Sequence, residues 1–328
     1  MGKYQQEKKI VRSYFDSMEK AAPEEVEKVL AQYVSSNYDW KGSYPFRQQY
    51  GTTDVAKKFW IPFKQALGNM QRRQDIFIAG NNELNDSEVW VMSMGNFMGN
   101  FQKDWLGIRK TNKLINLRYA EFACVQDGKI NKTGLFVDLI GFMVHAGFNP
   151  LPAMEGSCYV YPGPREHNGL LFEDANEAES AITLKLIVDM CKEVVPYDEN
   201  RDQLPKDGIT KYYWAEDMLW YGSTGATYTI PVFEKGQQNF RSTLKDRKFV
   251  NHTTRFAQGQ FGCFFGWPNI VNTPAGGYLG LPGGQVAAEM QVVDVYYRKE
   301  NKLAENWVII DIPYWLKQQG LDLFDKAK

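Results

Sequence analysis

The stretch that decides the fold is ENWVIIDIPYWLKQQG, residues 305–320. Its first half is rich in strand-forming residues and ends at Asp311, and its second half has helical character as far as Gly320. Residues 131–147, NKTGLFVDLIGFMVHAG, repeat this order, with Asp138 at the junction and Gly147 at the end. A carboxylate therefore stands twice in the chain where an apolar strand meets a helix.

The two stretches belong to a longer internal repeat. Residues 119–147 align without a gap to residues 292–320, and Asp138 falls on Asp311 at an offset of 173. At the same offset, WLGI at 105–108 meets YLGL at 278–281, and further upstream DWKG at 39–42 resembles LWYG at 219–222. Several matches in the same order indicate two homologous domains.

We expect a first domain over residues 1–150, a Pro/Gly-rich linker over 151–170 and a second domain over 171–328. In each domain helical periodicity comes first and strand patterns follow, which is typical of an α+β fold. Glycines scattered along the strands permit strong bending. A bent antiparallel sheet with helices over its concave face would enclose a pocket.

The motifs WLGI, QDGKI and FVDLIGFMVHAG in the first half, and YLGLP, ENKL and NWVIIDIPYWLKQQG in the second, resemble the SnoaL-like polyketide cyclases of the NTF2-like superfamily. The resemblance covers nearly the whole chain and implies two tandem cystatin-like cone domains. Two departures stand out. Gly134 replaces the tryptophan of the motif, which the second copy keeps as Trp307, and the GTH strand motif is absent from both halves. The two pockets are therefore not expected to be equivalent.

Asp311 and Asp138 are the candidate catalytic residues. Residues two apart on a strand share a face, so Asp311 is expected to point the same way as Trp307 and Ile309. The resemblance implies that such an aspartate lies in an apolar cavity and acts as general acid/base, and burial would raise the pKa of its carboxyl. The alternative is structural, because an aspartate just before a helix is a favoured N-cap.

Further residues are candidates for binding a substrate. Aromatic side chains could line the pocket mouths, polar residues in the middle of strands could hold a carbonyl or enolate oxygen, and a histidine could be a second acid/base. Core packing or an exposed strand position is the alternative for each. The candidates are Trp40, Trp105, Arg118, Trp220, His252, Tyr278, Glu289 and Trp307.

Composition and motifs exclude several partners. The formal net charge is −1, so no overall field attracts nucleic acid, and no apolar run approaches the roughly 20 residues of a membrane span. The spacing of the histidines and cysteines fits no zinc motif, and no phosphate-binding glycine loop occurs. We expect a cytoplasmic protein with free cysteines, without a metal or cofactor and without a nucleic-acid or membrane partner.

The interpretation that best fits the sequence is a cofactor-independent acid/base enzyme acting on a carbonyl-containing apolar or aromatic small molecule, as an aldol-type cyclase, isomerase or dehydratase. The alternative is a non-catalytic protein that binds a small molecule or a partner. A water-activating hydrolase would need more polar groups beside the aspartate. Since single-domain relatives often pair through their sheets, the tandem copies are expected to form an internal pseudo-dimer.

Overall fold

The computed structural model describes residues 2–199 and 210–326. The chain divides into two compact units. Unit 1 comprises Met1–Phe148, Pro162–Asp174 and Leu323–Lys328, and unit 2 comprises Asn149–Tyr161 and Ala175–Asp322. The residues expected to form a linker are therefore shared out, the earlier part packing with unit 2 and the later part with unit 1.

Unit 1 contains one six-stranded sheet in the order β2-β1-β6-β5-β4-β3. All neighbouring strands are antiparallel except β1 and β6, which run parallel. The sheet is thus mixed, and the expectation of a wholly antiparallel sheet is corrected at this pair. The strands are β1 (Val34–Gly42), β2 (Arg47–Tyr50), β3 (Leu67–Asn82), β4 (Asn85–Phe101), β5 (Leu114–Gln126) and β6 (Lys129–Val137).

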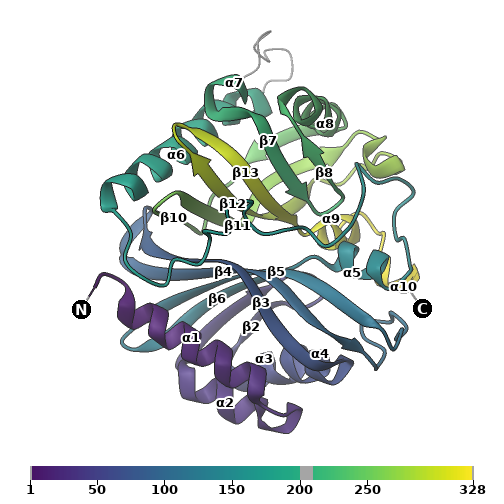
Figure 1. The fold of residues 1–328 in the computed structure, drawn as a ribbon. Helices are drawn as coiled ribbons and strands as arrows, with labels where there is room; N and C mark the ends of the chain where they lie inside the picture. Colours follow the sequence, from purple (N-terminus) through teal and green to yellow (C-terminus); the bar gives the residue numbers. More distant parts are fainter. Residues whose placement is uncertain (1, 200–209, 327–328) are drawn as a thin grey trace. The chain divides into compact units, whose positions relative to one another are not determined.

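Helices α1 to α4 of unit 1 lie on the same side of this sheet (Figure 1). Helix α1 buries Val11, Tyr14, Phe15 and Met18, whose spacing forms one helical stripe. A π-helical turn precedes Pro62, which has no N–H for the helical ladder. The helical segments are α1 (Gln5–Lys20), η1 (Pro23–Glu25), α2 (Val26–Tyr33), α3 (Gly51–Val55), η2 (Ala56–Trp60), α4 (Ile61–Ala66), α5 (Leu139–His145) and α10 (Leu323–Lys326).

Unit 2 repeats this topology. Its sheet runs β8-β7-β13-β12-β11, with β7 parallel to β13, and both β9 and β10 pair with β11 where unit 1 has the single strand β3. The strands are β7 (Trp214–Gly222), β8 (Gly225–Tyr228), β9 (Leu244–Phe249), β10 (Thr254–Gln258), β11 (Phe261–Pro274), β12 (Ala288–Lys299) and β13 (Lys302–Ile310). The helices are α6 (Glu177–Glu199), α7 (Thr210–Tyr213), α8 (Ile230–Ser242), η4 (Tyr278–Gly280) and α9 (Ile312–Lys317).

The two units also share local details. In each, a tryptophan ring lies against a glycine two residues on, so closely that a Cβ on Gly42 or Gly222 would fall about 2 Å from the ring of Trp40 or Trp220. In each, a serine hydroxyl after that glycine accepts a hydrogen bond from the end of the last strand, at 3.0 Å. The expected α+β class with two tandem domains is confirmed.

Candidate functional site

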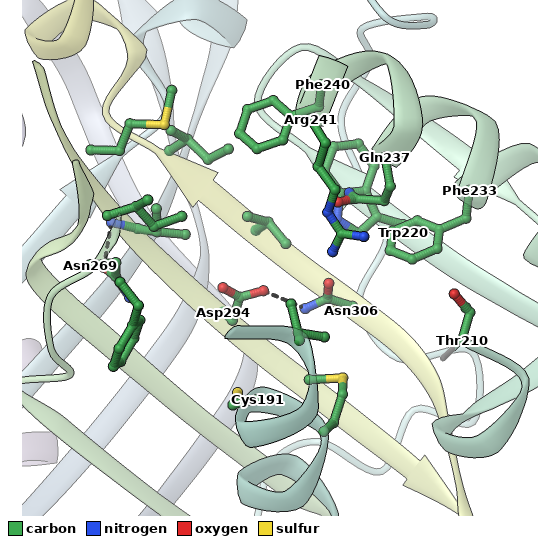
Figure 2. A pocket seen from close by; sticks show the side chains of 18 of the residues that line it. Cys191, Thr210, Trp220, Phe233, Gln237, Phe240, Arg241, Asn269, Asp294 and Asn306 are labelled. Carbon is green, nitrogen blue, oxygen red and sulfur yellow. Dashed lines mark hydrogen bonds between the residues drawn. The ribbon is translucent and has the colours of Figure 1, made fainter. Parts of the chain in front are cut away.

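Unit 2 encloses a cavity of about 410 Å³ between its sheet and helices α6 and α8. Strands β12 and β13 form one wall and α8 another, as the close view in Figure 2 shows. Aromatic and aliphatic side chains make up just over half of its lining, and most of the others are polar or charged. The lining residues are Met190, Cys191, Val194, Thr210, Trp214, Trp220, Phe233, Glu234, Gln237, Gln238, Phe240, Arg241, Arg247, Phe249, His252, Phe264, Asn269, Ile270, Met290, Val292, Asp294, Tyr296, Asn306, Val308 and Ile310.

Two carboxylates, Asp294 and Glu234, line this cavity, and Asp294 is the one on the sheet. It lies in the middle of β12, where strand alternation sends Met290, Val292 and Tyr296 to the same face. Burial raises the pKa of Asp294 from 3.8 to about 6, although hydrogen bonds from Asn306 and Tyr296 oppose the rise. Asp294 is half-buried as a residue and lines the cavity, so a ligand there can contact its side chain.

Asn306 holds the carboxylate from the neighbouring strand. Its Nδ2 donates to Asp294 Oδ1 at 3.2 Å and to the carbonyl oxygen of Val295 at 3.1 Å. Val308 and Ile310 follow it on the cavity face of β13. Figure 2 shows Asp294 and Asn306 side by side on the two strands. The hydrogen bond from Asn306 holds the Asp294 carboxylate in place. Because Asn306 is neutral, it does not compensate the negative charge of the carboxylate.

Helix α8 forms the facing wall. Phe233, Gln237, Phe240 and Arg241 are spaced to lie on one side of the helix, and all four line the cavity. In Figure 2 Gln237 and Arg241 extend from α8 toward the strands that carry Asp294 and Asn306. Phe233 packs against Trp220 with ring centroids 6.3 Å apart. The arrangement offers flat apolar surfaces beside a few hydrogen-bonding groups.

His252 completes the lining, in the break between β9 and β10. Its imidazole is 3% exposed and stacks on Phe264 with centroids 4.0 Å apart and planes 18° apart. Burial, with a smaller contribution from Arg255, lowers the pKa of His252 from 6.5 to about 3. The ring is therefore neutral at any physiological pH.

The corresponding place in unit 1 is filled. At the repeat offset of 173, Glu121 falls on Asp294. Glu121 is fully buried and forms an ion pair with Arg72 at 2.7 Å, and Tyr14 Oη donates to its Oε1 at 3.3 Å. The Arg72 guanidinium also lies 3.7 Å from the ring centroid of Phe15. Side chains of α1 and β3 thus pack directly against the Glu121 carboxylate and around its partner Arg72.

Of the substrate-binding candidates, Trp220 and His252 lie in the cavity. Trp307 points to the opposite face of β13, where it stacks on Tyr221 at 5.8 Å. It does so because Asn306, Val308 and Ile310 take the cavity face. Trp307 and Asp311 are therefore not among the lining residues.

Both candidate catalytic aspartates cap helices. Asp311 accepts a hydrogen bond from the Tyr314 amide of α9 at 3.2 Å, and Asp138 accepts one from the Gly141 amide of α5 at 3.0 Å. Asp138 also pairs with Arg118 at 2.9 Å, with both side chains buried. These contacts match the helix N-cap role, which is the structural alternative that the sequence offers for both aspartates.

The other candidates pack elsewhere. Trp40 packs against Phe59 in unit 1 with the two rings tilted, and Trp105, also in unit 1, packs on phenylalanine rings. Tyr278 contacts Phe240 and borders a second cavity of about 100 Å³ in unit 2. Glu289 accepts a hydrogen bond from Gln291 at 3.3 Å on the far face of β12.

Within residues 2–199 and 210–326, no group of three or more histidine, cysteine, aspartate or glutamate side chains is placed to hold a metal ion. In the same part of the chain, no helix combines the length and apolar character needed to cross a membrane. The four cysteines are free thiols.

No protein-family model matches the chain, and no curated protein sequence matches it. Solved structures do. A protein from Jannaschia sp. CCS1 named as a SnoaL-like polyketide cyclase is 14% identical, with 43% of this chain and 91% of that chain covered and a TM-score of 0.34. IdmH from Streptomyces antibioticus, named as a polyketide cyclase, is 13% identical, with 41% and 98% covered and a TM-score of 0.31.

An NTF2-like protein from Burkholderia thailandensis E264 is 15% identical, with 43% of this chain and 95% of that chain covered and a TM-score of 0.32. Each match covers less than half of this chain. At these identities and TM-scores, the similarity says nothing about the ligand or the reaction of this chain. The names of these neighbours are those of the superfamily that the sequence motifs resemble.

Proposed function

We propose that unit 2 is a cofactor-independent acid/base enzyme for a small, apolar or aromatic carbonyl compound, with Asp294 as the general base. The observation that carries the proposal is a carboxyl group, held by Asn306, on the wall of a cavity of about 410 Å³. That volume lies within the roughly 300–1,000 Å³ of small-molecule sites. We thereby move the acid/base role from Asp311 and Asp138 to Asp294.

The chemistry follows from the position of the carboxyl. With a pKa of about 6, Asp294 is mostly ionised at neutral pH yet is a stronger base than an ordinary aspartate. It can accept a proton from a carbon next to a carbonyl and return it elsewhere. Aldol-type cyclisation, isomerisation and dehydration share that first step. Asn306 and Tyr296 orient the carboxylate without supplying a positive charge that would weaken it as a base.

Unit 1 is proposed to be a scaffold without this activity. Its equivalent carboxylate, Glu121, is engaged by Arg72 and is fully buried. A carboxylate in a close ion pair is a weak base, because proton uptake would break the pair. One ligand per chain is therefore expected. The internal pseudo-dimer and the cytoplasmic location stay predictions.

The test is proton exchange on candidate ketones in deuterium oxide, followed by proton NMR. Enzyme-catalysed loss of the signal next to the carbonyl should fall at least a hundredfold in Asp294→Asn, which is the usual range for a general base. Asp311→Asn is the matched control, since it removes a buried carboxylate of unit 2 that lies outside the cavity. The proposal fails if Asp294→Asn exchanges as fast as the native protein.

A binding protein without chemistry is the second candidate. The observation that favours it is the wall composition, because aromatic and aliphatic side chains predominate over groups that could act as acids or bases. Under this alternative, ketones bind to unit 2 with one ligand per chain but exchange no protons faster than they do in buffer. Calorimetric titration alongside the exchange measurement separates the two.

A further inference from the structure

The imidazole of His252 presents a buried polar atom inside the cavity wall. Its side chain lines the cavity and is 3% exposed. Within the part of the chain that the structure describes, Nδ1 is inaccessible and has no hydrogen-bond partner. A buried polar atom without a partner is unfavourable, and a phenylalanine in the same place would avoid the penalty. Nε2 is not among these inaccessible atoms, so it is the ring nitrogen that a ligand in the cavity can meet.

The ring is held in a fixed orientation. It stacks on Phe264 and meets the edge of Phe249 with centroids 5.1 Å apart and planes at 82°. Phe264 in turn is the cross-strand neighbour of Asp294 in the ladder between β11 and β12. Phe264 therefore links the imidazole and the carboxylate along one wall of the cavity, so a single ligand can meet both groups.

The two groups differ in their protonation behaviour. Desolvation keeps His252 neutral, since its pKa is lowered to about 3, whereas Asp294, with a pKa of about 6, takes up a proton readily. A neutral imidazole is a poor base but a competent hydrogen-bond donor. Enzymes use such an imidazole to polarise a carbonyl while a carboxylate removes the neighbouring proton.

We propose that His252 is a second catalytic residue, which donates a hydrogen bond from its neutral ring to the carbonyl oxygen of the ligand. This inference rests on the proposed function of Asp294 and narrows its substrate class to enolisable ketones and aldehydes. The bond between carbon and the abstracted hydrogen breaks, and the proton goes to Asp294. The electron pair of the broken bond forms the carbon–carbon double bond of the enolate, and the carbonyl π electrons move onto the oxygen, which His252 stabilises. Return of the proton from Asp294 to carbon regenerates the ketone and the carboxylate.

The test compares a ketone with its hydrocarbon analogue in two variants. The probes are 2-acetylnaphthalene, labelled with ¹³C at the carbonyl, and 2-ethylnaphthalene. His252→Phe keeps the stack on Phe264 and removes the nitrogens, and His252→Gln keeps a neutral N–H donor. Binding is measured by calorimetry, and the carbonyl stretch of the bound ketone by infrared difference spectroscopy.

We expect the native protein to bind the ketone about tenfold more tightly than the hydrocarbon, which corresponds to one net hydrogen bond. The carbonyl band should move to lower frequency on binding. In His252→Phe the preference and the band shift should both disappear while hydrocarbon binding stays the same. His252→Gln should keep part of the shift, which shows that the donor and not the ring shape causes it.

A carbonyl band shifted equally in His252→Phe would overturn the role of His252 and leave Asp294 untouched. An absent shift in the native protein with the ketone bound would overturn it as well. The proposed function fails by a different result, namely proton exchange that is unaffected by Asp294→Asn. The two ideas can therefore fall separately.

Discussion

Replacing Arg72 by methionine should show how much the buried ion pair and ring contacts of Arg72 contribute to the stability of unit 1. The Arg72 side chain is 5% exposed, and its partner Glu121 is fully buried. Removing one partner of a buried ion pair costs about 3–5 kcal/mol, because the other charge is left uncompensated. The guanidinium also lies over the rings of Phe15, Phe97 and Tyr119, and losing such contacts adds about 1 kcal/mol.

We therefore expect Arg72→Met to destabilise unit 1 by about 4–6 kcal/mol, a large part of the roughly 5–15 kcal/mol of a typical domain. Adding Glu121→Gln should recover at least about 2 kcal/mol, because the uncompensated charge is gone. The assay is urea unfolding, with hydrogen exchange of the β5 peptide at 114–126 reporting on unit 1. Arg73→Met is the matched control, since Arg73 is exposed and should change stability by at most about 0.5 kcal/mol.

Two results would refute this reasoning. One is a cost below about 1 kcal/mol for Arg72→Met, which would mean that the ion pair and the ring contacts are not energetically coupled to the fold. The other is a double variant no more stable than Arg72→Met alone. Either result would contradict the claim that the buried ion pair of Arg72 and Glu121 stabilises unit 1.

The remaining predictions concern unit 2 and its cavity. Folding raises the pKa of Asp294 from 3.8 to about 6, so the folded state binds the proton more tightly and unit 2 should lose up to about 3 kcal/mol of stability as pH rises through this window. Urea unfolding between pH 3.5 and roughly 7 checks this, and Asp294→Asn should abolish the loss. Trp220→Ala should weaken ketone binding about tenfold or more by calorimetry, whereas Trp40→Ala should destabilise unit 1 by about 3–5 kcal/mol and leave binding unchanged. A maleimide on Cys191, which lines the cavity, should block ketone binding in a Cys158→Ser background, and bound ketone should slow the labelling; unaffected binding in the labelled protein would contradict the assigned cavity.

The repeat carried most of the fold information in the sequence. The gapless alignment of 119–147 with 292–320 predicts two copies of one unit, and the structure places Asp138 and Asp311 at equivalent helix starts. The parallel pair formed by the first and last strands of each sheet was missed. Strand periodicity shows which residues share a face but not which strands are neighbours.

The site was harder to predict. Alternation correctly groups Trp307 with Asp311, but it does not say which face of β13 the helices cover. That depends on the bend of the sheet and on where α8 packs, both of which are tertiary properties. The signal for Asp294 was nevertheless present, since the repeat aligns it with Glu121, and each stands in the middle of an apolar strand. A carboxylate at equivalent positions inside two apolar strands is a sequence signal of the same kind as the pair of capping aspartates.

The difference between the units could not be derived from composition. Asp294 and Glu121 are chemically similar, and what separates them is the neighbour supplied by another strand or helix. In unit 1 that neighbour is Arg72, and in unit 2 it is the neutral Asn306. The sequence predicts that the two pockets are not equivalent, but only the packing shows which of them is open beside its carboxylate.

The most direct measurement of the central claim is a carbon-13 NMR titration of the aspartate carboxyl groups, with the resonance of Asp294 assigned by its loss in Asp294→Asn. A pKa of about 6 that changes when a ketone fills the cavity is predicted, because burial beside neutral partners opposes ionisation. A resonance that titrates near 3.8 and does not respond to any ketone would show that this carboxyl is well hydrated and takes no part in a ligand site.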